Sequence, residues 1–274
     1  MPKIILADKA GFCYGVKRAI DLASQVKGKG FSLGEIIHNP QMMAKLEAKG
    51  ITVVQSLSQV PDGSTVIIRA HGVSDKVLFE AKHKNLKIIN TTCPFVNKVH
   101  ILAKQMAQEG RQVIVLGEKE HPEVKGIVEN LDQPVVVSSL AEAKLVKNYE
   151  QIGFVSQTTQ QHQTFNDIKR ELANHTGDLK AIDTICDATS ERQQAATELA
   201  KQVDLMIVIG GRASGNTKRL YEICKSITEA IKIETVAELY LDKINKYKTI
   251  GITAGASTPD WLIQEVIDKI EKMD

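Results

Sequence analysis

Residues 87–93 of this chain read KIINTTC, and two other segments repeat the same passage from an apolar strand to a cysteine. Residues 180–186 read KAIDTIC, and residues 3–6, KIIL, lead through a longer loop to Cys13. After each cysteine, a glycine closes the next apolar strand, at Gly34, Gly117 and Gly210. This internal repetition predicts three similar modules of about 80 to 95 residues each.

Short apolar strands alternate with amphipathic helices along the whole chain, as at residues 65–69, 112–116 and 204–209. Such alternation indicates an α/β protein with parallel sheets. We place the modules at 14–93, 94–186 and 187–274, and we add residues 1–13 to the third because it lacks a final strand. The prediction is a ring of three units related by a pseudo-threefold axis, whose strand-end loops face a shared centre, where ligands of parallel sheets bind. The alternative is one continuous doubly wound sheet.

Composition narrows the functional classes. Thirty-five basic and thirty-three acidic residues leave a net charge of +2, and only 4% of residues are aromatic, which disfavours a nucleic-acid partner. No apolar run approaches the ~18 to 20 residues of a membrane helix. The N-terminal segment reaches Asp8 before a signal-peptide core could form, so we expect a cytoplasmic protein without a membrane span.

The four cysteines include no Cys-x-x-Cys pair, which argues against a disulfide framework and against a zinc ribbon. Cys13, Cys93 and Cys186 each precede a predicted helix, whose free N–H groups and positive dipole end favour a thiolate. Cys224 differs, because it falls on an apolar helical stripe with Leu220, Ile227 and Ile231, and we expect it in the core.

Three thiolates that converge from three modules would repel one another unless a cation or cluster neutralised them. A 4Fe-4S cluster usually takes four cysteines, so three would leave one iron open, as a catalytic metal requires. A zinc ion on the same three cysteines, with or without a histidine, is the alternative that the residues leave open.

Three histidines follow predicted strands: His38, His71 and His121. Together with the polar loops around Ser214, Asn216 and Ser257, they form an array of donors that suits a diphosphate. The other four histidines lie in polar helical contexts, and we expect them at the surface or on helix faces: His83, His100, His162 and His175.

Glu123 lies two residues beyond His121 and could deliver a proton to a leaving oxygen, with Thr158 as the relay. The alternative role for Glu123 is that of an ordinary acidic residue in the first turn of a helix.

Several ordered motifs resemble one family, the 4-hydroxy-3-methylbut-2-enyl diphosphate reductases or IspH/LytB enzymes, over nearly the whole chain. The motifs are AGFCYGV at 10–16, GEIIHNP at 34–40, RAHGV at 69–73, TTCP at 91–94, HPEVKG at 121–126, QTT at 157–159 and TAGAS at 253–257. The resemblance implies a trefoil of three α/β units around a 4Fe-4S cluster on Cys13, Cys93 and Cys186, whose fourth iron takes the substrate hydroxyl.

By the same resemblance, the diphosphate would be held by His38, His71, His121, Ser214, Asn216 and Ser257. Glu123 and Thr158, beside His121, would serve protonation at the hydroxyl. The implied reaction is a reductive dehydroxylation that consumes two electrons and two protons and yields isopentenyl and dimethylallyl diphosphates. Electrons would come from a ferredoxin or flavodoxin, and we expect a monomer.

The chain departs from the family pattern at two places. Gly215 stands where many relatives carry a second serine, so a backbone N–H or a water would replace one hydroxyl contact to the diphosphate. The segment from Asp187 to Glu191 is more acidic than expected, and the sequence leaves open whether this alters the cluster's potential or leaves it unaffected. The rival functions are a zinc enzyme that hydrolyses phosphate esters and a non-catalytic iron-sulfur redox sensor.

Overall fold

The computed structural model describes residues 2–272, which contain three four-stranded sheets whose paired strands are all parallel. The first sheet has the order β3 (Ile51–Val54), β2 (Gly30–Leu33), β4 (Thr65–Ile68) and β5 (Lys87–Asn90). The second has the order β7 (Val135–Val137), β6 (Gln112–Leu116), β8 (Gln151–Ser156) and β9 (Asp178–Ala181). The third has the order β1 (Lys3–Leu6), β12 (Thr249–Ala254), β10 (Leu205–Ile209) and β11 (Glu229–Ile233).

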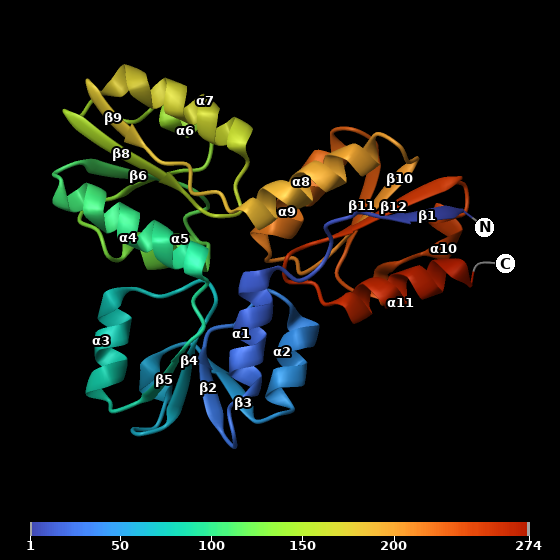
Figure 1. The fold of residues 1–274 in the computed structure, drawn as a ribbon, viewed down its shortest axis with the longest axis horizontal. Helices are drawn as coiled ribbons and strands as arrows, with labels where there is room; N and C mark the ends of the chain where they lie inside the picture. Colours follow the sequence, from blue (N-terminus) through green and yellow to red (C-terminus); the bar gives the residue numbers. More distant parts are fainter. Residues whose placement is uncertain (1, 273–274) are drawn as a thin grey trace. The chain divides into compact units, whose positions relative to one another are not determined.

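The same strand order recurs in all three sheets. The first strand in each lies between the second and the third, and the fourth follows the third at the edge. In the third sheet the N-terminal strand β1 takes the fourth place, because it pairs with β12 from Lys3 opposite Thr249 to Leu6 opposite Ile252. Figure 1 shows this blue strand beside the red β12. Three α/β modules with parallel sheets are therefore confirmed, and one continuous sheet is wrong; the module boundaries stay a prediction.

Helices follow the strands and cover the sheets. Figure 1 shows α4 and α5 on one face of the second sheet and α6 and α7 on the other. The helices are α1 (Tyr14–Ser24), α2 (Pro40–Glu47), α3 (Asp75–His83), α4 (Pro94–Gln108), α5 (Pro122–Val128), α6 (Leu140–Ala143), α7 (His162–Leu172), α8 (Asp187–Ala200), α9 (Gly215–Lys225), α10 (Leu241–Ile244) and α11 (Asp260–Glu271).

Burial explains why these segments adopt these elements. On α7 the buried residues Phe165, Ile168 and Leu172 recur at a spacing of three to four and form an apolar stripe. All five residues of β10 are buried, which fits a parallel strand that is covered on both faces. One expectation on α9 is corrected: the helix ends at Lys225, so Ile227 and Ile231 lie beyond it and do not extend its apolar stripe.

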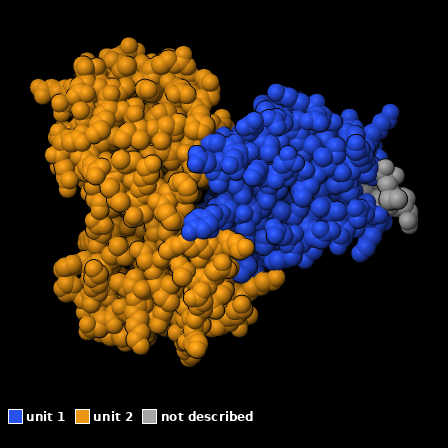
Figure 2. All heavy atoms as spheres, in the orientation of Figure 1, with its two compact units in different colours: residues 1–16, 38–42, 187–274 blue, residues 17–37, 43–186 orange. Residues whose placement is uncertain are grey.

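The chain divides into two compact units, coloured separately in Figure 2. One unit holds the residues up to Val16, His38–Met42 and the chain from Asp187 onward, and the other holds Lys17–Ile37 and Met43–Cys186. Each helix within residues 2–272 is too short or too polar to cross a lipid bilayer.

Candidate active site

Cys13, Cys93 and Cys186 occupy equivalent places, each after the last strand of its sheet and directly before a helix. Backbone hydrogen bonds fix all three, because their N–H groups donate to the carbonyl oxygens of Ala256 (3.1 Å), Ala70 (2.9 Å) and Thr158 (3.1 Å), respectively. The Sγ of Cys13 also accepts a weak hydrogen bond from the N–H of Val16 in the first turn of α1 (3.5 Å). The three side chains are partly exposed, so each thiol can reach a ligand.

Cys224 has the opposite surroundings. It is fully buried on α9, and burial raises the pKa of its thiol to about 12. A thiol that holds its proton so firmly is a poor metal ligand, since the thiolate is the binding form. None of the four cysteines, all in the described part of the chain, forms a disulfide.

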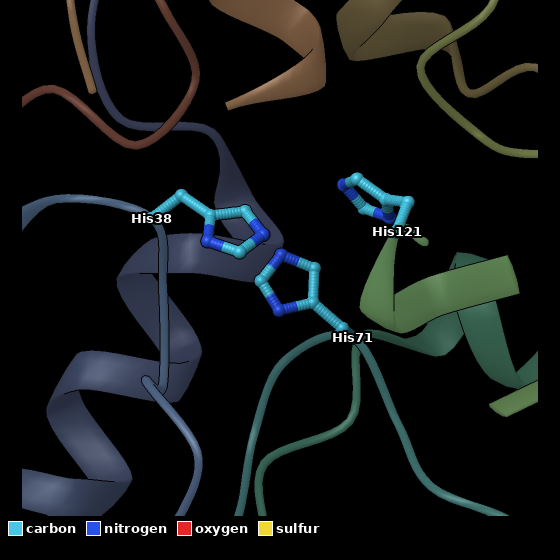
Figure 3. Close-up of side chains that lie close together, drawn as sticks. All are labelled: His38, His71 and His121. Atoms are coloured by element: carbon cyan, nitrogen blue, oxygen red, sulfur yellow. The ribbon is translucent and has the colours of Figure 1, made fainter. Parts of the chain in front are cut away.

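His71 and His121 lie close together within one compact unit. Their ring centroids are 5.4 Å apart and the rings meet edge to face at 85° (Figure 3). His71 lies in the loop after β4, which is closed by a hydrogen bond from Arg69 Nε to the carbonyl oxygen of Gly72 (3.3 Å). Gly72 has a φ of +74°, which a residue with a side chain rarely adopts, so the glycine permits this turn.

His121 is the N-cap of α5, and Pro122 occupies the first turn. The Nδ1 of His121 accepts a hydrogen bond from the N–H of Glu123 (3.2 Å). With Nδ1 acting as an acceptor, the neutral ring carries its proton on Nε2, which is then a donor for an anion. The helix N-terminus adds its positive dipole end at the same place.

Glu123 and Thr158, the predicted acid and its relay, are joined by two hydrogen bonds. The N–H of Thr158 donates to Oε1 of Glu123 (2.7 Å), and its hydroxyl donates to Oε2 (2.9 Å). Glu123 is only 2% exposed, and this burial raises the pKa of its carboxyl to about 7, although the two bonds from Thr158 oppose the shift. An acid with such a pKa can hold a proton at neutral pH.

The loop that carries Thr158 is held by the buried Gln157. Its Oε1 accepts from the N–H of Glu118 (3.2 Å), and its Nε2 donates to the hydroxyl of Thr159 (2.9 Å). The loop is therefore tied to the strand-end loop that leads into His121. The position of Thr158 after a predicted strand marked it in the sequence, but no sequence signal predicted the hydrogen bonds of Gln157.

The remaining predicted donors lie in the other compact unit. Ser214 is the N-cap of α9 and accepts from the N–H of Thr217 (3.3 Å), and Gly215 is the first residue of that helix. Ser257 donates to the carbonyl oxygen of His38 (3.1 Å). Asn216 is 3% exposed, and neither Oδ1 nor Nδ2 has a hydrogen-bond partner among the described residues. A buried amide without a partner is costly, which indicates that a polar ligand completes it.

Two buried side chains, His100 and Arg192, have surroundings that the sequence did not predict. His100 was expected at the surface or on a helix face; it lies on α4, but it is only 6% exposed, and its ring lies between Gly72 and Gly126. Burial, together with the positive charge of Lys104, lowers the pKa of His100 to about 4. Arg192 was not singled out at all, although it is buried and contacts the loop that carries Cys13. No local sequence signal marks either residue, because their neighbours lie in distant segments.

Comparisons with known proteins match this chain over nearly its full length and point to one family. The family described as LytB protein matches residues 4–271. A 4-hydroxy-3-methylbut-2-enyl diphosphate reductase of Geobacter sulfurreducens is 44% identical and covers 99% of this chain and 98% of that protein. The enzyme of the same name from Aquifex aeolicus is 42% identical and covers 100% of this chain and 97% of that protein.

Solved structures give the same result. A (E)-4-hydroxy-3-methyl-but-2-enyl diphosphate reductase, described as the terminal enzyme of the non-mevalonate pathway, is 42% identical over the whole of both chains, with a TM-score of 0.72. The E-1-hydroxy-2-methyl-but-2-enyl-4-diphosphate reductase from Plasmodium falciparum is 31% identical, with a TM-score of 0.92 over 98% of this chain and 87% of that chain. Sequence and structure together place this chain in the LytB protein family.

Proposed function

We propose that this chain catalyses the reductive dehydroxylation of 4-hydroxy-3-methylbut-2-enyl diphosphate to isopentenyl and dimethylallyl diphosphates, the terminal step of the non-mevalonate pathway. The observation that carries the proposal is the family match over residues 4–271. Relatives with this name at 41 to 46% identity cover nearly the whole chain. The reaction takes up two electrons and two protons and releases water as the C–O bond breaks.

The chemistry of three cysteines supports a 4Fe-4S cluster as the cofactor. Cys13, Cys93 and Cys186 are partly exposed and start helices, where thiolates are favoured, whereas Cys224 is buried with a pKa raised to about 12. The cluster would be held by the first three and would supply the electrons for C–O bond cleavage. A zinc ion on the same cysteines is the alternative that must be tested.

The diphosphate would be bound by side chains that donate hydrogen bonds and by helix N-termini. We assign this role to His38, His71, His121, Ser214, Gly215, Asn216, Thr158 and Ser257. The paired rings of His71 and His121 and the amide of Asn216, which lacks a partner among the described residues, support the assignment. Gly215 contributes only its backbone N–H, at the start of α9.

Proton delivery would fall to Glu123, with Thr158 and His121 beside it. Its raised pKa of about 7 keeps a proton available near neutrality, and Thr158 orients both carboxyl oxygens. The proton would pass to the leaving hydroxyl oxygen, so that water departs instead of hydroxide. Binding of the diphosphate would hold that oxygen within reach of the acid.

We further propose that a ferredoxin or flavodoxin supplies the electrons, that the chain acts as a monomer, and that it works in the cytoplasm. A reducing compartment keeps cysteine thiols available for a cluster, and the cysteines here form no disulfide.

Anaerobic purification with iron and acid-labile sulfide analysis, followed by turnover with reduced viologen, tests the proposal. A brown protein that contains sulfide and consumes the allylic diphosphate is expected. A colourless protein that contains zinc would favour the phosphate-ester hydrolase instead. A brown protein that fails to consume the diphosphate would favour a redox sensor.

A further inference from the structure

Arg192 lies in the second turn of α8 and is only 6% exposed. Its guanidinium makes three hydrogen bonds, and all of them go to backbone carbonyl oxygens. Nε and Nη2 donate to Gly11 at 3.2 and 2.8 Å, and Nη1 donates to Ala188 at 2.7 Å. The side chain therefore joins two backbone segments that are 177 residues apart in the sequence (188 − 11).

Both segments lead to a proposed cluster ligand. Gly11 is the second residue before Cys13, and Ala188 is the second residue after Cys186. Two residues of extended chain span at most ~7 Å, and the guanidinium is bonded two residues along the chain from each cysteine. The Cys13 loop is also held rigidly, since Gly11 and Cys13 donate to the carbonyl oxygens of Ala254 (3.3 Å) and Ala256 (3.1 Å).

The charge of Arg192 has no counter-ion in the described part of the chain. No carboxylate there lies within 4 Å of the guanidinium, and its hydrogen-bond acceptors are neutral. Asp260, which faces Gly11, is exposed to water, which weakens its field at a buried site. A buried cation without an anion is strongly unfavourable.

Helix electrostatics do not account for the position of Arg192 either. A cation near the N-terminal end of a helix opposes the positive end of the helix dipole. The side chain nevertheless turns toward that end to reach Ala188. An anion beside the cysteine loops would supply the missing counter-charge.

We infer that Arg192 is a positioning residue that orients the Cys13 loop and supplies the counter-charge for an anionic centre formed by the cysteine thiolates and the iron-sulfur cluster. This inference rests on the proposed function. Reduction adds a negative charge to that centre, and a buried positive charge nearby stabilises the reduced form more than the oxidised form. Arg192 therefore raises the reduction potential.

Two substitutions separate charge from shape. Arg192→Lys keeps the positive charge but cannot reproduce the forked pattern of hydrogen bonds, and Arg192→Gln removes the charge. Lys201→Gln is the matched control, because Lys201 directly follows the same helix and is exposed to solvent. Each protein is purified anaerobically as the cluster-loaded enzyme, and its midpoint potential is measured by spectroscopic redox titration, together with iron and sulfide content.

We expect Arg192→Gln to shift the equilibrium toward the oxidised cluster by at least about tenfold, which corresponds to a potential about 59 mV lower for one electron. Arg192→Lys and Lys201→Gln should change that equilibrium less than twofold. An unchanged potential in Arg192→Gln would overturn the inference. So would a fall in Arg192→Lys as large as that in Arg192→Gln, because it would show that the hydrogen bonds of the side chain matter and its charge does not.

Circular dichroism and iron content decide the remaining outcomes. If Arg192→Gln folds without iron while Arg192→Lys holds a full cluster at normal potential, the charge requirement is supported. If both fold without iron, the inference is wrong and the forked hydrogen bonds alone matter. If Arg192→Gln does not fold, the midpoint potential of Arg192→Lys is the test. An unchanged potential supports the inference, and a fall of about 59 mV overturns it. Iron and sulfide missing from the unsubstituted protein would instead refute the proposed function, and this inference with it.

Discussion

Glu123 shows how local surroundings set the chemistry of one side chain. It lies in the first turn of α5, where an exposed glutamate would only stabilise the helix dipole. Here the carboxyl is 2% exposed, and both oxygens accept hydrogen bonds from Thr158. Burial dominates these bonds and raises the pKa to about 7, so the alternative role as an ordinary first-turn acid does not account for its environment.

Glu123→Gln keeps the size and shape of the side chain but removes its titratable proton. We expect turnover to fall by at least ~100-fold, the lower range for loss of a general acid, while the cluster spectrum stays intact. Glu129→Gln, at the exposed end of the same helix, is the control and should retain activity. Near-normal turnover of Glu123→Gln with reduced viologen would remove Glu123 from the mechanism.

Stability should also depend on pH through Glu123. Its pKa rises from 4.5 in an ordinary setting to about 7 in the folded chain, so between these values the folded state binds more protons than the unfolded state. The free energy of unfolding therefore falls as pH rises through this window, by on the order of 3 kcal/mol at most.

Urea unfolding at pH 5 and pH 8 measures this effect. Glu123→Gln should lose less stability than the unsubstituted protein over that interval, since its amide does not titrate. Equal losses in both proteins would show that Glu123 does not hold its proton in the folded state.

Cys224 offers a test of the division of the cysteines. Cys224→Ser places a hydroxyl in a fully buried apolar position, and we expect a loss of about 1–3 kcal/mol in the free energy of unfolding. Iron content should stay at the level of the unsubstituted protein, whereas Cys93→Ser should lose iron. A Cys224→Ser protein that folds but lacks iron would contradict the assignment of ligands.

The loop after β12 packs closely against the N-terminus of α9. A Cβ atom on Gly255 would lie 2.1 Å from Oγ1 of Thr217, far inside van der Waals contact. Thr217 is buried in the first turn of α9, next to Asn216. The glycine therefore lets the loop that carries Ser257 approach the helix N-terminus that carries Ser214.

Gly255→Ala should force these two elements apart. We expect a loss of about 1–3 kcal/mol in the free energy of unfolding, typical of overpacking, and an increased KM for the diphosphate. Gly177→Ala is the control, since no atom lies within 4 Å of its Cβ position. Thr217→Ala combined with Gly255→Ala should recover part of the lost stability, and strictly additive effects of the two substitutions would contradict the contact.

The sequence predicted where helices begin better than it predicted which distant segments their side chains contact. The strand-to-cysteine repeats correctly placed helix starts after Cys13, Cys93 and Cys186, because strand ends and caps leave local signals. The burial of His100 was not predicted, since it depends on Gly72 and Gly126, which belong to other segments. Arg192 was missed for the same reason, because its main partner, Gly11, is 181 residues away.

At the scale of the molecule, the strand order repeats three times, and β1 completes the third sheet. Repetition made this topology predictable, because each module closes its sheet in the same way and only the third lacked a final strand. The side-chain details were not predictable, since the unsatisfied amide of Asn216 and the raised pKa of Glu123 arise from packing between distant loops.

Removal of the proposed cluster tests the chain as a whole. Cys13, Cys93 and Cys186 follow β1, β5 and β9, which belong to three different sheets, so one ligand shared by them would stabilise loops from every module. A ligand that binds only the folded chain, at a concentration a thousandfold above its Kd, contributes about 4 kcal/mol. For a chain of this size, that corresponds to a fall in Tm of roughly 10 °C when iron is removed.

Anaerobic thermal unfolding of the protein with and without iron measures this difference. Cys224→Ser should show the same difference as the unsubstituted protein, because its buried thiol is not among the proposed ligands. Cys13→Ser should melt near the iron-free value whether or not iron is supplied. Equal Tm values for the iron-loaded and iron-free protein would mean that the thiols do not share a ligand in the folded state, and the cluster assignment would then fail even if the protein binds some iron.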